Sequence, residues 1–374
     1  MVYLDYSATT PINKEVLETF NKASLNFIGN PNSLHKLGVE SKKLIDSATN
    51  QISSIMGVKS EEIIYTSGSS ESNNMAIKGI ALKYQNRGKH IITTKLEHSS
   101  IIAPINYLQN NGFDIDFVEL DSNGLVDINN LKSLMRDDTI LVSINSVNSE
   151  VGILQPINEI GKLLKEYPKC FFHTDITQSV GKVNISLDNV DLASFSAHKF
   201  YGPKGVGVLI KKEKVLLEPL IHGGKSTTIY RSGTPALPLI VSLSKALRLA
   251  ITDIDNKYNY IKDLNSYLRE ELSKYEDVYI NSNNYSIPHI LNISILGIKP
   301  ETMLHALEEK DIYISTQSAC SSGNTSLSVM SITNDVERAK SSIRISLSSL
   351  TTMEEVKYFL SVFEDCYKHL KFKD

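Results

Sequence analysis

Cysteine is scarce in this sequence. Only three cysteines occur among its 374 residues, at positions 170, 320 and 366. An odd number of widely separated cysteines does not make a disulfide framework, which excludes the small disulfide-stabilised secreted domains. Isolated, reduced thiols are typical of cytoplasmic proteins, and we expect this protein to be cytoplasmic.

Long apolar runs are missing as well. No segment approaches the ~20 consecutive apolar residues that a membrane-spanning helix needs. The first residues do not place a basic segment before an apolar one, as a secretion signal does. The formal net charge is only −3, which provides no general attraction to nucleic acid or to anionic membranes. We therefore expect a protein that binds neither of them directly.

The first two thirds of the chain alternate between short apolar runs and amphipathic helical patterns. A strand pattern at 140–144 and a helical pattern at 157–166 are examples, and such alternation is typical of parallel strands joined by crossover helices. A charged amphipathic segment at 245–275 predicts one long connecting helix. Strand patterns near 289–295 and 342–347 then predict a smaller α+β unit, and the chain is long enough for two domains.

One lysine stands at a position typical of ligand sites. Lys199 follows a strand pattern at 190–195 and precedes a turn containing Gly and Pro and a second strand pattern at 206–210. Open α/β sheets bind their ligands at the carboxyl ends of the strands. Partial burial there disfavours the ammonium form, so the amine can attack an aldehyde, and pyridoxal 5'-phosphate is the commonest partner for that chemistry. A solvated lysine beside a hairpin turn is the alternative.

Such a cofactor needs an anion site, an acid for its ring nitrogen and a partner for its ring, and each has a candidate. Ser69 and Ser70 lie in a Gly-containing turn before a helical pattern, where backbone N–H groups and hydroxyls can bind phosphate. Asp175 ends a strand pattern, with Gln178 close behind it, and His98 follows another strand pattern. A serine helix cap, a turn aspartate and a structural histidine are the alternatives at these positions.

Taken in their order along the chain, these blocks resemble the cysteine desulfurases of the NifS/IscS type, in the class V aminotransferase group. The resemblance covers nearly the whole chain, with further matching blocks at 3–11, 29–35 and 342–347. It implies an α/β protein with the pyridoxal-phosphate-dependent transferase fold type I. A large domain at 13–255 would contain a mixed, mostly parallel sheet. Residues 1–12 and 256–374 would form a smaller α+β domain.

The resemblance also implies a role for each candidate residue. Lys199 would bind the cofactor covalently, His98 would stack on its ring, and Asp175 would pair with the ring nitrogen. Gln178 and Asn148 would lie near the phenolic oxygen, and Asn148 also near the substrate. The cofactor phosphate would contact hydroxyl and imidazole groups at Ser69, Ser70, Ser196 and His198, and Thr234 of a neighbouring subunit. Because that site is shared between subunits, the resemblance implies a homodimer.

A desulfurase needs a second nucleophile, and Cys320 is the candidate. It lies in a small, polar segment at 315–326 that predicts an exposed loop, whereas Cys170 and Cys366 lie in patterns typical of buried cysteines. The resemblance implies a sulfurtransferase that converts L-cysteine to L-alanine and holds the sulfur as a persulfide on Cys320. A sulfur-acceptor protein, either an iron–sulfur scaffold or a tRNA-thiolation enzyme, would then receive it.

Arg344 is the candidate for the substrate carboxylate, because a guanidinium group can bind both oxygens at once. Along this strand pattern Ile343 and Ile345 share one face and Arg344 lies on the other. An exposed arginine on a sheet surface is the alternative.

Some positions depart from the family pattern. Residues 223–228 replace a Gly-Gly-Gly-Gln-Glu segment, Gln317 replaces a glycine, and a Gly-Arg pair is missing at 348–349. These differences leave open another class V enzyme, such as an aminotransferase or a selenocysteine lyase, and a weakened homologue that acts as a binding partner. A nucleotide-binding loop at 224–226 is excluded because Pro219 stands where that loop needs glycine. No metal site is expected.

Overall fold

The computed structural model describes residues 1–316 and 325–371. Its largest feature is a seven-stranded sheet with five neighbouring parallel strands at one side. At the other side, one strand runs antiparallel to both of its neighbours. The order across the sheet is β2 (Ile63–Thr66), β8 (Gly207–Lys211), β7 (Leu192–Ser196), β6 (Phe171–Asp175), β5 (Thr139–Ser143), β3 (His90–Thr93) and β4 (Asp114–Phe117). The predicted mixed, mostly parallel sheet is confirmed.

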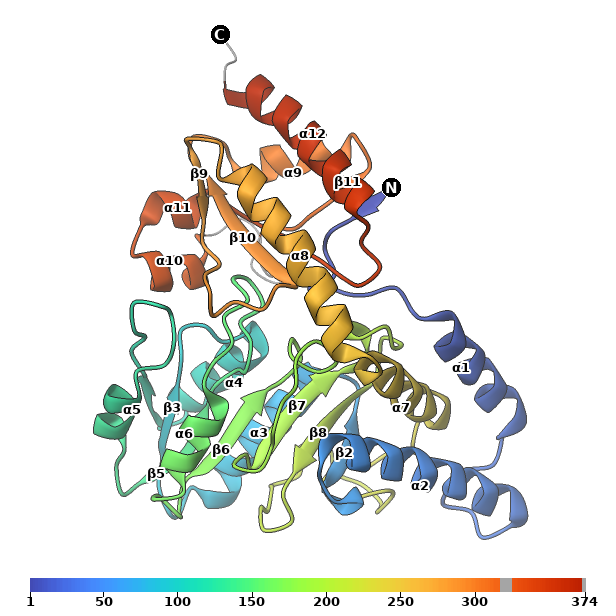
Figure 1. Cartoon of the computed structure of the whole chain (residues 1–374). Helices are drawn as coiled ribbons and strands as arrows, with labels where there is room; N and C mark the ends of the chain where they lie inside the picture. Colours follow the sequence, from blue (N-terminus) through green and yellow to red (C-terminus); the bar gives the residue numbers. More distant parts are fainter. Residues whose placement is uncertain (317–324, 372–374) are drawn as a thin grey trace.

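Helices cover both faces of this sheet (Figure 1). Successive side chains of a strand point to opposite faces, and Leu141 and Phe171 accordingly pack into one apolar core while Val142 and Phe172 pack into another. Helices α3 (Ser69–Tyr84) and α4 (Ser99–Gln109) contribute to the first core. The second core includes residues of α1 (Lys14–Asn26), α2 (Lys36–Met56), α5 (Ile128–Leu134), α6 (Ile157–Leu164) and α7 (Leu237–Ile251).

A second, antiparallel sheet of three strands packs around an apolar core of its own, which includes Leu264, Leu291 and Phe359. The chain's first strand pairs with a short strand of this part, so the N-terminus joins the C-terminal region (Figure 1). The elements are β1 (Val2–Tyr3), α8 (Ile254–Leu272), β9 (Val278–Ile280), β10 (Ile290–Ile295), α9 (Pro300–Glu308), β11 (Ile312–Tyr313), α10 (Leu327–Thr333), α11 (Val336–Lys340), β12 (Ser342–Ser346) and α12 (Met353–Lys371). The domain boundaries 13–255 and 256–374 stay a prediction.

The single helix predicted at 245–275 is wrong, because the structure has two helices there, α7 and α8. Asp253 between them has a φ of 60°, a left-handed conformation that a right-handed helix does not include. The Nζ atom of Lys257 donates hydrogen bonds to the carbonyl oxygens of Leu249 (2.9 Å) and Thr252 (2.6 Å), which satisfies groups left open at the end of α7. Among the described residues, no helix is long and apolar enough for a membrane span.

Candidate active site

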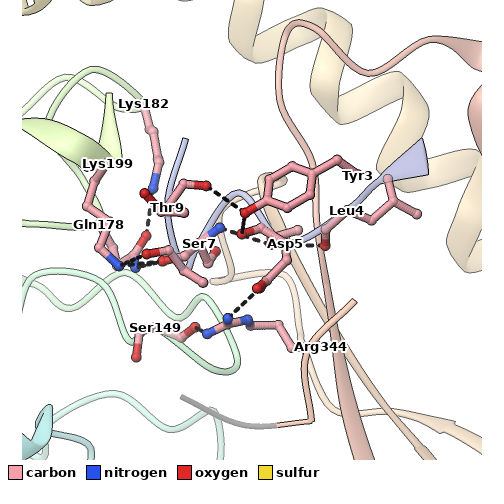
Figure 2. A network of polar contacts seen from close by, with 12 residues as sticks. Tyr3, Leu4, Asp5, Ser7, Thr9, Ser149, Gln178, Lys182, Lys199 and Arg344 are labelled. Carbon is pink, nitrogen blue, oxygen red and sulfur yellow. Dashed lines mark hydrogen bonds and ion pairs between the residues drawn. The ribbon is translucent and has the colours of Figure 1, made fainter. Parts of the chain in front are cut away.

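A cavity of about 270 Å³ lies at the carboxyl ends of the parallel strands. Lys199 reaches it from the turn that directly follows β7. Its Nζ atom donates hydrogen bonds to the carbonyl oxygens of Ser7 (2.6 Å) and Ala8 (2.8 Å) (Figure 2). Eight residues predicted from the sequence line the cavity: Ser69, Ser70, His98, Asp175, Gln178, His198, Lys199 and Arg344.

Asp175 is the last residue of β6 and is buried in the cavity wall. Its Oδ1 atom accepts a hydrogen bond from the backbone N–H of Thr177 (2.9 Å), and its Oδ2 atom accepts one from Nδ2 of Asn73 (2.8 Å). These two donors hold the carboxylate in one orientation. Because a carboxylate has about four acceptor positions, Asp175 can still accept a hydrogen bond from a ligand in the cavity.

His98 is the N-cap of α4 and is linked to Asp175 through two side chains. Its Nδ1 atom accepts from the N–H of Ser100 (3.2 Å) and lies 2.8 Å from the Oγ atom of that serine. The same Oγ atom accepts from Nδ2 of Asn73 (2.8 Å), the amide that also contacts Asp175. Burial lowers the pKa of His98, so its imidazole is neutral at pH 7 with the proton on Nε2. The imidazole can donate the proton on Nε2. It can accept a proton only at Nδ1, after Nδ1 gives up its hydrogen bond from the N–H of Ser100.

The N-terminus of α3 faces the same cavity and offers an anion site. Oγ of Ser196 accepts from the N–H of Ser69 (2.6 Å) and donates to the Oγ atom of Ser69 (3.0 Å). The turn lies directly against β8, where a Cβ atom at Gly207 would come within 2.6 Å of Cα of Gly68. A helix N-terminus with clustered hydroxyls is a common phosphate site. His198 also lines the cavity.

Gln178 is buried beside Lys199 and has a defined amide orientation. Its Nε2 atom donates to the carbonyl oxygen of Ser7 (2.9 Å), and its Oε1 atom accepts from Nζ of Lys182 (2.6 Å). The carbonyl group of Ser7 therefore receives hydrogen bonds from two predicted site residues, Gln178 and Lys199 (Figure 2). The N-terminal segment is thus a wall of the cavity.

Arg344 lies on β12 and is only 1% exposed, so the alternative of an exposed sheet arginine is wrong. Its Nη2 atom lies 2.8 Å from Oδ1 of Asp5, and its Nη1 atom donates to the carbonyl oxygen of Ser149 (2.8 Å) (Figure 2). The guanidinium group is held by both contacts at the cavity wall. Its Nε atom is buried and has no hydrogen-bond partner among the described residues.

Three of the predicted residues that the structure describes do not line this cavity. Nδ2 of Asn148 donates to the carbonyl oxygen of Leu96 (2.8 Å) and to Oγ of Ser328 (3.2 Å), and its Oδ1 atom accepts from two backbone N–H groups. Its side chain is therefore engaged within the protein. Thr234 is exposed on the segment that follows Arg231. Ser196 acts through Ser69 rather than as a lining residue.

The three cysteines are in different positions relative to the described structure. Cys320 lies outside the described residues. Cys170 is buried next to β6, as predicted, and burial raises the pKa of its thiol. Cys366 is partly buried against the core beneath α12. Neither of these two is placed as a cavity nucleophile.

The sequence reasoning missed several residues that build the site: Asp5, Ser7, Ala8, Asn73, Asn145, Ser149 and Lys182. Three of them, Ser7, Ala8 and Ser149, contribute backbone carbonyl groups, for which no side-chain pattern exists. Asn73 lies in the turn and helical pattern that contain Ser69 and Ser70. A polar amide so close to a predicted anion site is a sequence signal for a site residue. Asp5 could not be paired from sequence because its partner, Arg344, is 339 positions away.

The fold and the cavity define a class of protein. The chain belongs to the class V aminotransferase family, whose model matches residues 2–359. Two of its similar relatives belong to one group within that family, the cysteine desulfurases and NifS-like proteins. It is 42% identical over 376 residues to a protein named cysteine desulfurase IscS from Dictyoglomus turgidum, covering 99% of this chain and 95% of the relative. It is 40% identical over 380 residues to a NifS/IcsS protein homolog from Lactobacillus delbrueckii subsp. bulgaricus, covering 99% and 98%.

Solved structures agree with these relatives. A NifS-like protein superimposes with a TM-score of 0.93 and 35% identity, covering all of both chains. A structure described as SspA in complex with cysteine superimposes with a TM-score of 0.83 and 31% identity, covering 94% of this chain and all of the other. The predicted fold class, a fold type I α/β protein of the NifS/IscS group, is confirmed.

Proposed function

We propose that the protein is a pyridoxal-phosphate-dependent cysteine desulfurase, which converts L-cysteine to L-alanine. The observation that carries this proposal is the meeting of Lys199, Asp175, His98 and Arg344 around one cavity, although they come from four separate segments. An amine, a buried carboxylate, a neutral imidazole and a buried guanidinium are the groups this chemistry needs. The similarity to relatives named cysteine desulfurase supports the same function.

The residues present fit the cofactor that the family implies. The N-terminus of α3 with Ser69, Ser70 and Ser196 suits a phosphate, supported by His198. Asp175 retains acceptor capacity for a protonated ring nitrogen, and Gln178 presents an N–H group beside Lys199. When bound, pyridoxal phosphate supplies an aldehyde that lysine or substrate amines can bind, and a ring that takes up electrons from the substrate.

Lys199 and His98 would move the protons. The amine of Lys199, once released from the cofactor, would remove the proton on the substrate's α-carbon. The imidazole of His98 is neutral at pH 7 because burial lowers its pKa, so it can act as a proton carrier near the substrate. Ser100 holds its ring in place and is itself held by Asn73.

Arg344 would bind the substrate carboxylate. Its guanidinium group is buried at the cavity wall and already oriented by Asp5 and Ser149. A preoriented guanidinium loses little freedom when it binds a carboxylate. Asn148, whose side chain is engaged with Leu96 and Ser328, would act on the substrate only after those bonds rearrange.

Cys320 would accept the sulfur. Its thiolate would attack the substrate's Sγ atom, forming an S–S bond while the Cβ–Sγ bond breaks and its electron pair stays on carbon. Protonation of that carbon skeleton yields alanine, and the persulfide on Cys320 passes its outer sulfur to an acceptor. Support for this role comes from the sequence around position 320. An iron–sulfur scaffold or a tRNA-thiolation enzyme is the proposed acceptor.

Three further features belong to the proposal. Thr234, exposed and away from its own cavity, would contact the phosphate in a neighbouring subunit of a homodimer. The division into domains at 13–255 and at 1–12 with 256–374 is supported by the separate apolar cores. A cytoplasmic location is supported by the isolated cysteines.

The test is one paired assay of wild type and Cys320→Ser, with Cys366→Ser as the matched control. Purified wild type should show the visible absorption of bound pyridoxal phosphate and release alanine and sulfide from L-cysteine. Cys320→Ser should keep the absorption and lose sulfide release, while Cys366→Ser keeps both. Full desulfuration by Cys320→Ser would assign the sulfur chemistry elsewhere. Turnover of selenocysteine but not cysteine would identify a selenocysteine lyase, and amino-group transfer to a keto acid would identify an aminotransferase.

A further inference from the structure

Lys182 is a buried lysine next to the proposed active site, without an assigned role. It lies four residues after Gln178 and is 8% exposed. Its Nζ atom donates a hydrogen bond of 2.6 Å to Oε1 of Gln178 (Figure 2). Contacts with charged donors are about twice as strong as those between neutral groups, so when Lys182 is protonated this bond is stronger than the one that the Gln178 amide makes with Ser7.

Within the part of the chain that the structure describes, no carboxylate is found to compensate the charge of Lys182. It lines a second cavity of about 240 Å³, which shares Lys199 with the first, and none of the described residues lining that cavity is acidic. Burial, and then the charges of Lys199 and Arg344, lower the pKa of Lys182 to about 7. A buried amine without an acidic partner costs stability, and an apolar side chain of similar length would not. Folding alone does not explain a lysine at this position.

The chemistry of the two side chains decides which way the Gln178 amide faces. In its ammonium form Lys182 has three donor positions and no acceptor, so this form requires the amide to turn its oxygen toward Lys182. Its NH₂ group then faces the opposite side, where it donates to the carbonyl oxygen of Ser7 beside Lys199. The carbonyl oxygen of Ser7, which can only accept, favours the same orientation, so Lys182 adds a second contact that holds the amide from its other side.

We propose that Lys182 is a positioning residue of this active site: it holds the Gln178 amide with its NH₂ group toward Lys199, so that Gln178 donates to an oxygen bound there. This inference rests on the proposed function. In that site the oxygen would be the phenolic oxygen of pyridoxal phosphate. An amide locked as donor stabilises the anionic form of that oxygen over the hydroxyl form, because only the anion is purely an acceptor.

The experiment compares Lys182→Met with wild type and with Lys257→Met. Lys257 lines the same second cavity but binds the carbonyl groups at the end of α7, so its loss should lower stability and leave the amide alone. In Lys182→Met we expect the dissociation constant for pyridoxal 5'-phosphate to rise about tenfold, the value of one hydrogen bond to a charged partner. The midpoint of the visible band in a pH titration should rise by about one unit. Lys257→Met should leave both quantities unchanged.

A double-mutant cycle separates positioning from a general effect on folding. In a Gln178→Met background, Lys182→Met should cause no further change in cofactor affinity or in the titration midpoint. An equal change in both backgrounds, or none in the wild-type background, would overturn the inference. Lys182→Gln, which keeps a polar group of similar size, covers the case in which Lys182→Met does not fold, and it should show an intermediate shift. Absence of any visible band in wild type would instead overturn the proposed function.

Discussion

Nη2 of Arg344 lies 2.8 Å from Oδ1 of Asp5, joining two segments that are 339 positions apart. The backbone immediately around Asp5 also pairs with β12, through an isolated bridge between Asp5 and Ser346. Two residues further on, the same segment provides the carbonyl group that binds both Gln178 and Lys199 (Figure 2). The N-terminal segment therefore connects the substrate-binding arginine with the cofactor-binding lysine of the proposed site.

We expect Asp5→Asn to lower the free energy of unfolding by roughly 3 kcal/mol, because it leaves the charge of buried Arg344 without its partner. It should also raise KM for L-cysteine more than it lowers kcat, since the guanidinium group loses one of its two fixed contacts. Urea denaturation and steady-state kinetics measure the two effects. Asp46→Asn removes a solvent-exposed ion pair with Lys42 and should cost less than about 1 kcal/mol. Equal losses for both variants would contradict this prediction.

We expect Glu97 to make the stability of the protein decrease as pH rises. Burial raises its pKa from 4.5 to about 8, so between these values the folded protein holds a proton that the unfolded chain has released. The free energy of unfolding should therefore fall as pH rises through this window, by roughly 1.4 kcal/mol per unit from this group. Glu97→Gln cannot titrate, and its oxygen can still accept from Oγ1 of Thr94 and the N–H of Asn145.

Urea denaturation of wild type and Glu97→Gln at pH 5, 6, 7 and 8 tests this directly. The stability difference between the two proteins should change steadily in favour of the variant as pH rises. Glu159→Gln, an exposed position on α6, should follow wild type at every pH. Parallel curves for wild type and Glu97→Gln would show that the carboxyl group is already ionised in the folded protein.

Asp175→Asn should reduce desulfuration by roughly 10²- to 10³-fold, the range typical for loss of one preorganised electrostatic contact. An amide at this position can no longer accept from both Thr177 and Asn73, nor pair with a protonated ring nitrogen. Asp191→Asn is the control, since Asp191 also accepts a backbone hydrogen bond, from Phe172, at the opposite end of the strands. Steady-state rates should fall for Asp175→Asn alone. A similar fall for both variants would assign the loss to the fold.

Thr234 allows a test of a shared site by complementation. If Thr234 contacts the phosphate of the neighbouring subunit, Thr234→Asp and Lys199→Ala homodimers should both be inactive. In a mixed dimer, the subunit with intact Lys199 would receive Thr234 from the other one. Coexpression of the two variants with different tags should then restore about a quarter of the wild-type activity, because half of the dimers are mixed and each has one complete site. No restoration would place Thr234 in its own subunit's site or outside any site.

Local patterns in the sequence predicted much of the fold. The strands at 139–143 and 171–175 and the turn at Lys199 follow from apolar runs that end in polar or small residues, a property of neighbouring positions. The break between α7 and α8 was not predictable in this way. The apolar periodicity continues across it, and the extended conformation of Thr252 and the left-handed conformation of Asp253 interrupt the helix.

The residues of the candidate site likewise fall into those that the sequence predicts and those that it does not. The sequence by itself determined the amine, the carboxylate, the imidazole and the guanidinium, at Lys199, Asp175, His98 and Arg344, because these depend on residue type and on the ends of strands. Only the tertiary structure decided which groups orient them. The contacts of Asp5 with Arg344 and of Lys182 with Gln178 depend on the directions of side chains and on core packing that brings distant segments together. A local sequence pattern predicts neither of these.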